Sequence, residues 1–244
     1  MRQPRKIITL EPMIATIVNC VTVFIGSMLG LFLHAKISEE FKDTVFTGVG
    51  LFTLIVGIAM ALKSERMVYL ALSIVSGGLL GNLLDIEGKI LAFGEWLKQI
   101  FAHKNSKHDF AYGFLNASVL FCVGAMTLVG AFKAGAEGEY TLILTKSVMD
   151  GFMAILLTAA QGIGVAFSIL TILVYQGGLT QLAGFVKPLV TPLVLSELTG
   201  VGGALVMMIG FNLLNLRKIK TGNFLPALVI VLFLIALEPF LPKF

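Results

Sequence analysis

The chain has few charged residues and few cysteines, and both shortages restrict what it can be. Only 13% of its 244 residues are charged, 18 lysines and arginines against 14 aspartates and glutamates, whereas soluble domains carry about 25%. Such a sequence has too little polar surface to cover a water-facing globule. Its 57% hydrophobic content and mean hydropathy of +0.94 predict an all-α, polytopic transmembrane helix bundle, one integral membrane domain over residues 1–244.

Other absences exclude classes of function. Cys20 and Cys122 lie inside apolar runs, where a disulfide is not expected. The net charge of +4 is too small and scattered for nucleic-acid binding. The chain lacks the phosphate-binding Gly-x4-Gly-Lys-Ser/Thr loop of nucleotide-driven pumps, and we expect no cofactor.

The histidines lie outside the apolar runs and favour neither an enzyme nor a metal site. His34, His103 and His108 fall in expected loops, so no catalytic constellation sits at membrane depth. His103, His108 and Asp109 are closely spaced but lack a convincing ligand geometry, and we interpret them as part of a solvated loop. We therefore expect a protein that is not an enzyme.

Seven uncharged runs predict the membrane topology. Six have a length that suits one crossing, roughly 17–25 residues. The fifth, residues 151–186, would reach about 54 Å as one helix, nearly twice the ~30 Å hydrocarbon core. It must bend, and Gln176-Gly177-Gly178 is the expected place.

The segment after that bend carries Lys187 and two prolines, and it is either a kinked eighth span or a re-entrant hairpin covered by protein. We favour eight spans over seven plus a re-entrant segment. They are expected at about residues 13–33, 44–62, 67–84, 110–132, 148–175, 179–196, 198–216 and 221–240. Residues 86–101 show amphipathic helical spacing with Trp96 and predict a helix at the membrane interface. Basic residues are divided too evenly between alternate loops to fix the orientation.

The fifth span carries the richest polar pattern. Small and hydrogen-bonding side chains recur along one face at helical spacing, from Ser147 through Thr158, Gln161 and Ser168 to Tyr175. That face is either a close-packing seam or a solute path. Gln161 is the strongest path candidate, because the neighbouring Gly162-Ile163-Gly164 weakens the helix and exposes backbone carbonyls.

Polar residues in other spans extend this pattern. The predicted substrate path consists of Asn19, Asn116, Thr158, Gln161, Ser168 and Gln176. Lys146 and Asp150 stand four residues apart at the expected start of the fifth span. We interpret them as a capping ion pair favoured by the helix dipole, with a coupling proton on Asp150 as the alternative. Glu197 resembles the start of a helix capped by Ser196, a structural role.

A weak internal repeat is present. Thr-Gly-Val-Gly occurs at residues 47–50 and again at 199–202, opening the second and seventh expected spans. When the two units are aligned outward from these motifs, Asn19 falls close to the position that matches Gln176. The two three-helix units would begin on opposite sides of the membrane, an inverted repeat on which alternating access is often built.

Four separated motifs resemble one known family. They are Ala15-Thr16-Ile17-Val18-Asn19, Phe121-Cys122-Val123-Gly124-Ala125-Met126, Lys146-Ser147-Val148-Met149-Asp150-Gly151-Phe152 and Tyr175-Gln176-Gly177-Gly178. In these, and across residues 13–237, the chain resembles the YdfK/YqgA-type family of bacterial inner-membrane proteins of unknown function. The resemblance implies a multi-pass protein of the bacterial inner membrane. The chain departs from it in a basic 12-residue N-terminal extension.

The predicted function follows from the neutral polar groups inside the spans. Neutral donors and acceptors can replace the hydration shell of a small polar solute or ion. The sequence therefore predicts a secondary transporter or facilitator for such a solute. The alternative is a non-transporting scaffold or regulatory subunit, whose polar seams serve packing alone. Expected partners are membrane lipid and the solute, and a homo-oligomer stays open.

Overall fold

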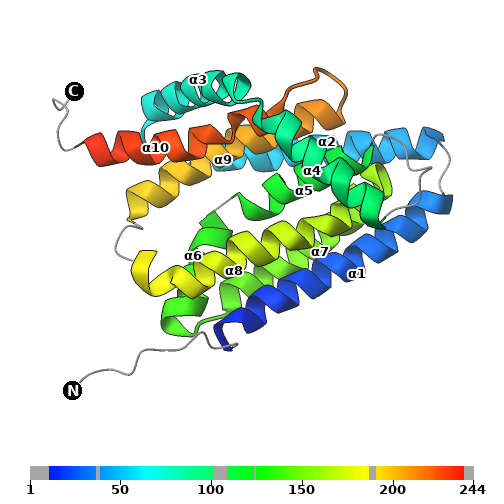
Figure 1. The fold of residues 1–244 in the computed structure, drawn as a ribbon, viewed down its shortest axis with the longest axis horizontal. Helices are drawn as coiled ribbons and strands as arrows, with labels where there is room; N and C mark the ends of the chain where they lie inside the picture. Colours follow the sequence, from blue (N-terminus) through cyan, green and yellow to red (C-terminus); the bar gives the residue numbers. More distant parts are fainter. Residues whose placement is uncertain (1–10, 37–38, 102–108, 124, 187–190, 239–244) are drawn as a thin grey trace.

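The computed structural model describes residues 11–36, 39–101, 109–123, 125–186 and 191–238, and within these ranges it holds helices and no strand. The predicted all-α bundle is confirmed (Figure 1). Its α-helices are α1 (Ile14–Lys36), α2 (Glu39–Ala61), α3 (Met67–Leu83), α4 (Ile86–Phe101), α5 (Asp109–Cys122), α6 (Ala125–Glu137), α7 (Thr141–Gln161), α8 (Ser168–Val186), α9 (Pro192–Leu213) and α10 (Pro226–Leu237). Short 3-10 helices are η1 (Glu11–Met13), η2 (Ile163–Phe167) and η4 (Thr221–Phe224).

Several of these helices are long and apolar enough to cross a bilayer. Within the described residues there are five: Ile14–Leu33, Asp43–Ala61, Thr141–Gln161, Ile163–Ala183 and Pro192–Leu213. Two bent pairs, α3 with α4 at 59° and α5 with α6 at 61°, raise the number to seven if each pair forms one span. Thr221–Leu237 is a shorter apolar segment. The eight-span topology stays a prediction.

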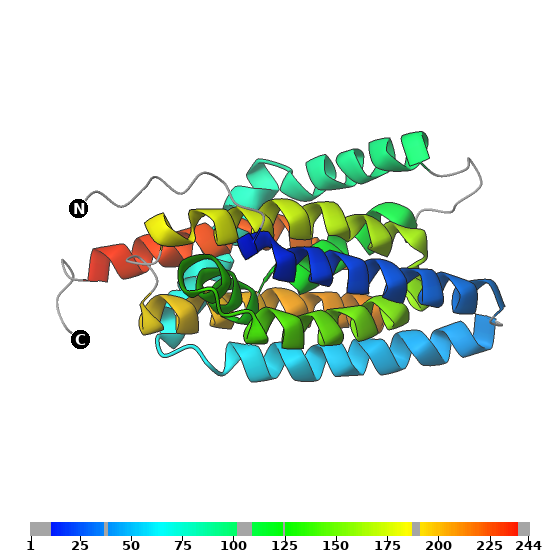
Figure 2. The same cartoon turned by 90° about the horizontal axis from the view of Figure 1, so that it is seen from below.

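The largest helix contact joins α1 to α7, which run in the same direction. Figure 2 shows α1, α7 and α2 side by side on one face of the bundle, with α8 on the other side of α1. Gly26 of α1 packs against Gly151 and Ala154, and Gly30 packs against Ile155 and Thr158. Glycines spaced by four residues let two helix backbones approach closely inside a membrane.

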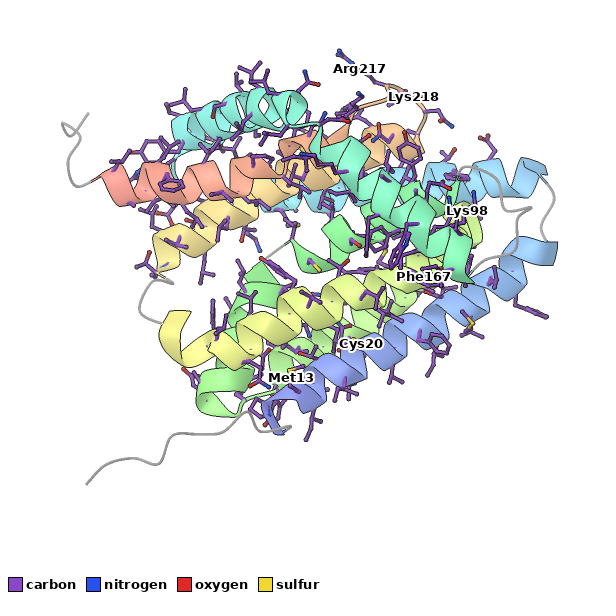
Figure 3. All side chains as sticks on the ribbon, viewed as in Figure 1. Met13, Cys20, Lys98, Phe167, Arg217 and Lys218 are labelled. Atoms are coloured by element: carbon purple, nitrogen blue, oxygen red, sulfur yellow. The ribbon has the colours of Figure 1, made fainter. Side chains whose placement is uncertain are left out.

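The turn after α9 carries basic residues. Figure 3 shows Arg217 and Lys218 on the turn after α9, away from the packed helices. That turn is held by Asn212, whose Nδ2 donates to the Ile219 carbonyl at 2.8 Å while its Oδ1 accepts from the Ile219 N–H at 2.7 Å.

The predicted helix at 86–101 is confirmed as α4, with Trp96 52% exposed. Its place at the membrane interface stays a prediction.

The expected bend at Gln176-Gly177-Gly178 is wrong. These residues lie inside α8, and the chain breaks at Gly162, whose φ of 78° is a conformation that glycine adopts without strain. The expected span 148–175 is therefore divided between α7 and α8. Residues 179–196 form no span of their own, since α8 continues to Val186 and α9 begins at Pro192. Lys187 lies outside the described residues.

Two further expectations about helix boundaries need correction. The expected span 110–132 is a bent pair of helices instead of one straight helix, because α5 ends at Cys122 and α6 begins at Ala125. The helix at Glu197 begins at Pro192 with Thr191 as its N-cap, so Ser196 is not the cap.

Glu197 nevertheless has a structural role, at the start of a different helix. Its buried carboxylate accepts hydrogen bonds from Ser64 Oγ at 2.7 Å and from the backbone N–H groups of Glu65 and Arg66 at 2.7 and 2.8 Å. These N–H groups lie where α3 begins and have no partner inside the helix. Glu197 thus fastens α9 to the start of α3.

Replacing Glu197 with alanine is expected to lower the free energy of unfolding by about 2 kcal/mol or more, because three donors lose a charged acceptor. Unfolding by sodium dodecyl sulfate in detergent micelles, followed by circular dichroism, measures the change. Glu95→Ala removes an exposed carboxylate paired with Lys98 and should change stability by less than about 1 kcal/mol. Equal effects of the two substitutions would contradict the role given to Glu197.

Candidate functional site

A buried polar network joins α1, α7 and α8. Asn19 Nδ2 donates to Asp150 Oδ2 at 3.0 Å and to Gln176 Oε1 at 3.1 Å. Gln176 Nε2 donates to Thr16 Oγ1 at 3.1 Å, and Lys146 Nζ pairs with Asp150 Oδ2. None of the five residues is more than 7% exposed. We call this set the polar network.

Helical spacing brings these side chains to one place. Thr16 and Asn19 are three residues apart on α1, and Lys146 and Asp150 are four apart on α7, so each pair shares a helix face. Gln176 reaches both α1 residues from α8. The network therefore depends on the packing of all three helices.

The ion pair lies in the middle of α7, so our interpretation of it as a helix-start cap is wrong. α7 begins at Thr141, nine residues before Asp150, and the helix dipole acts mainly within the first turn. Charged groups inside a membrane span are rare, face the bundle interior and mark functional sites by default. Lys146 and Asp150 fit that description.

The network leaves one buried acceptor open. Asn19 Oδ1 has no hydrogen-bond partner among the described residues, although both hydrogen bonds of its Nδ2 group are made. A buried polar atom without a partner destabilises a fold by about 1–3 kcal/mol. A solute or water that donates to Asn19 Oδ1 would remove that penalty.

A cavity of about 500 Å³ has the ion pair in its wall. It lies between α2, the α5–α6 bend, α7 and α9. Its polar lining residues are Lys63, Lys146, Asp150, Thr53, Thr127 and Thr199, and the rest of the wall is apolar. Val148 and Phe152 also line it and are 71% and 59% exposed. The cavity therefore reaches the outer face of α7, and we call it the α2/α7 cavity.

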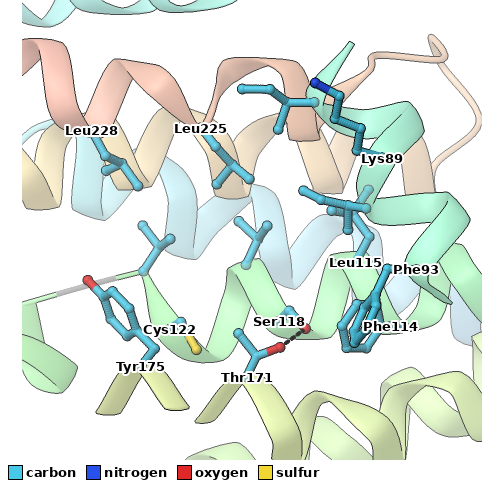
Figure 4. A pocket seen from close by; sticks show the side chains of 14 residues that line it. Lys89, Phe93, Phe114, Leu115, Ser118, Cys122, Thr171, Tyr175, Leu225 and Leu228 are labelled. Carbon is cyan, nitrogen blue, oxygen red and sulfur yellow. Dashed lines mark hydrogen bonds between the residues drawn. The ribbon is translucent and has the colours of Figure 1, made fainter. Parts of the chain in front are cut away.

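A second cavity of about 450 Å³ lies between α4, α5, α8 and α10 (Figure 4). Its wall is almost entirely apolar, with the hydroxyls of Ser118 and Thr171 satisfying each other at 2.8 Å. Lys89 lies at its α4 side and Tyr175 at its α8 side. Val123, directly after α5, lines both cavities. Because the wall is mostly apolar and the Ser118 and Thr171 hydroxyls bind one another, this cavity offers a polar solute few partners.

The structure brings some of the predicted path residues together. Asn19 and Gln176 bind each other directly. Thr158, Gln161 and Ser168 are buried where α7, η2 and α8 meet, and the oxygens Thr158 Oγ1, Gln161 Oε1 and Ser168 Oγ have no partner in the described part of the chain. Asn116 is buried in α5. These four line neither of the two cavities above, and a common path through them stays a prediction.

Sequence reasoning missed several residues of the site. Thr16 lies inside the motif Ala15–Asn19, three residues from Asn19. That spacing places both side chains on one helix face and could have predicted its part in the site. Thr53, Thr127 and Thr199 gave no signal, because threonine in an apolar helix commonly bonds its own backbone. Among the described residues, no group of three or more His, Cys, Asp or Glu could hold a metal ion. His103 and His108 lie outside those residues.

Five described helices that are long and apolar enough to cross a bilayer, one of them with a buried charged pair, indicate a multi-pass membrane protein. The chain belongs to the DUF554 family, described as a protein of unknown function, which matches residues 14–236. The family expected from the four motifs is thereby confirmed.

Two relatives show how far the similarity extends. The chain is 31% identical over 222 residues to the uncharacterized membrane protein YdfK of Bacillus subtilis (strain 168), covering 89% of this chain and 93% of that protein. It is 26% identical over 222 residues to the uncharacterized protein YqgA of Escherichia coli (strain K12), covering 90% and 94%. No solved structure matches the chain significantly.

Proposed function

We propose that this protein is a secondary transporter or facilitator that carries a small polar solute or ion across the bacterial inner membrane. The observation that carries the proposal is the polar network, with its ion pair in the wall of the α2/α7 cavity. Close helix packing uses small and hydroxyl side chains and does not need a buried lysine and aspartate. Ionisable groups inside membrane spans are rare and commonly mark the paths of solutes and ions.

The packing of α2 on α9 supports an inverted repeat. Four glycines make close contacts between the two antiparallel helices, and these contacts form two pairs. In each pair, adding 153 to the number of the α2 residue and subtracting 153 from the number of its α9 partner gives the two residues of the other contact. The pairs are Gly57 on Met207 with Gly210 on Leu54, and Gly50 on Leu214 with Gly203 on Ala61. Such reciprocal contacts are consistent with a two-fold axis, at an offset one residue longer than that between the two Thr-Gly-Val-Gly motifs. An axis relating antiparallel spans lies in the membrane plane, as in inverted-repeat transporters.

The part of the polar network formed by Thr16, Asn19 and Gln176 lies where the two proposed units meet, and α7 adds Lys146 and Asp150 from outside both units. Units of α1–α3 and α8–α10 pair α1 with α8, α2 with α9 and α3 with α10, and each of these pairs is in contact. The bond between Asn19 and Gln176 joins the first pair. Inverted-repeat transporters bind their solute at this kind of interface, near the bilayer midplane. Movement of one unit against the other would then open the network to either side.

Loss of the network amides is expected to reduce transport by about tenfold or more, since one lost hydrogen bond to a transported solute raises a barrier by about 1.4 kcal/mol. Purified protein in liposomes is tested for uptake of radiolabelled rubidium, sodium, amino acids and sugars. Asn19→Leu and Gln176→Leu should each reduce the uptake of the accepted probe. Gln99→Leu, on the exposed side of α4, is the matched control and should not.

Two results would contradict the proposal. Uptake that is indifferent to both Asn19→Leu and Gln176→Leu would remove the polar network from the path. No uptake of any probe, together with cysteines along the polar face of α7 that never react with water-soluble thiol reagents, would favour the scaffold or regulatory subunit.

A further inference from the structure

The buried ion pair in the wall of the α2/α7 cavity is neutral as a whole, and the third charged lining residue, Lys63, is exposed. Lys146 and Asp150 line the cavity as a pair, and both are almost fully buried. A buried charge is strongly unfavourable unless it is paired. A ligand with one charge would leave an uncompensated charge in this apolar wall. A ligand carrying both a carboxylate and an ammonium group can meet Lys146 with one and Asp150 with the other and keep the site neutral.

Both members of the ion pair have capacity for such a ligand. A lysine ammonium has three donors and a carboxylate accepts through two oxygens. The contacts between Asn19, Lys146 and Asp150 involve only Asp150 Oδ2. Asp150 Oδ1 and the remaining N–H groups of Lys146 are therefore the groups that can bind a zwitterion.

The threonines of the cavity favour an ammonium group. Thr53 Oγ1 donates to the Val49 carbonyl at 2.7 Å, Thr127 Oγ1 to Phe121 at 3.1 Å and Thr199 Oγ1 to Leu195 at 2.6 Å. Each hydroxyl has thus used its hydrogen and offers the cavity only lone pairs. Lone pairs in a buried wall suit a ligand that donates hydrogen bonds.

The rest of the wall excludes strongly hydrated solutes. It is formed by phenylalanine, valine, leucine and methionine side chains, among them Phe52, Phe121, Met126, Met149 and Met153. A sugar or an inorganic ion would lose water over this apolar surface and gain no polar partner from it. Methionine side chains are flexible and polarizable and adapt to apolar groups of different shape. At about 500 Å³ the cavity is within the usual size range of ligand pockets.

We propose that the α2/α7 cavity binds a zwitterionic α-amino acid with a large apolar side chain, its carboxylate on Lys146, its ammonium group on Asp150 and its side chain among the methionines and phenylalanines. This inference rests on the proposed transport function and names the class of its substrate.

Binding is tested on the full-length protein in lipid nanodiscs, with radiolabelled L-phenylalanine and L-leucine as probes. Both should bind saturably. 3-Phenylpropionate lacks the ammonium group, phenethylamine lacks the carboxylate and glycine lacks the apolar side chain. Each should compete about tenfold or more weakly than L-phenylalanine, because each loses one of the three recognised parts.

Variants separate the site from general effects on folding. The double substitution Lys146→Met with Asp150→Asn removes both charges together and should abolish binding. Val148→Trp places a large ring at the cavity opening and should weaken L-phenylalanine binding about fivefold or more. Val174→Trp, on the exposed face of α8 and away from the lining of both cavities, is its matched control and should leave binding unchanged.

The outcomes distinguish this inference from the proposed function. No saturable binding of either amino acid, by folded protein that still takes up another probe into liposomes, would overturn the inference and leave transport intact. Equal competition by phenethylamine or 3-phenylpropionate would also overturn it. Selective binding without uptake would support the ligand class and count against transport.

Discussion

Replacing Lys146 with methionine is expected to lower the free energy of unfolding by about 3–5 kcal/mol, because removal of one partner strands the other charge in a buried site. Asp150 would keep Asn19 as its hydrogen-bond donor within the network but would lose the opposite charge beside it. The folded state must then hold an uncompensated carboxylate or take up a proton. Unfolding by sodium dodecyl sulfate, followed by circular dichroism, measures the change.

Two further variants give this expectation its controls. Lys146→Met combined with Asp150→Asn removes both charges and should recover most of the lost stability. Lys133→Met breaks the exposed pair with Glu139 on the surface and should change the free energy of unfolding by no more than about 1 kcal/mol. If Lys146→Met behaved like Lys133→Met, the ion pair would be accessible to water in the resting protein.

Replacing Gly26 with leucine is expected to destabilise the protein by about 3 kcal/mol, the upper end of the usual effect of overpacking. A Cβ atom at this position would collide with the Gly151 carbonyl oxygen and lie 3.2 Å from the Ala154 Cβ. A backbone carbonyl cannot rotate away as a flexible side chain can, so α1 and α7 would have to separate. Because Asn19 binds Asp150 across the same pair of helices, the separation should also weaken the polar network.

Glycines without neighbours provide the contrast. A Cβ atom at Gly48 of α2 or Gly178 of α8 would meet nothing within 4 Å. Alanine there should be neutral or stabilise the protein by about 0.5–1 kcal/mol, since alanine favours a helix more than glycine does. Unfolding of Gly26→Leu, Gly48→Ala and Gly178→Ala under identical conditions tests whether close backbone approach holds α1 and α7 together. Tolerance of leucine at Gly26 would contradict it.

Much of the fold was predictable, because apolar runs of membrane length report helices directly. The position of a break is harder. Gly162 and Gly177 both follow a glutamine in one long apolar run, and only the tertiary structure decides that the chain turns at the first. Met13 packs against Gly177 and α1 holds Gln176, so α8 continues through the second. The break between α5 and α6 lies in an apolar run whose length suits a single span. The length of the run therefore did not predict the break.

The candidate site was predictable where a residue's own character singles it out. Asn19 and Gln176 are amides in apolar surroundings, which singled both out for the predicted path, and the structure joins them by a hydrogen bond. The depth of Asp150 was misjudged because the uncharged run begins at residue 151. The sequence therefore placed the ion pair at the end of the membrane span. Mutual neutralisation lets the helix continue through both charges. The α2/α7 cavity arises from the packing of distant segments, which no local pattern encodes.

The placement of both charges on one helix has a consequence for biosynthesis. Lys146 and Asp150 are one turn apart on α7, so they can neutralise each other as soon as the nascent segment coils. The segment can then enter the bilayer as an electrically balanced unit, before α8 and Gln176 have packed against it. If the two charges lay on separate helices, the helix that inserted first would carry an unpaired charge until the second helix arrived. Because the two charges are one turn apart, the insertion of α7 does not depend on a counterion from another helix.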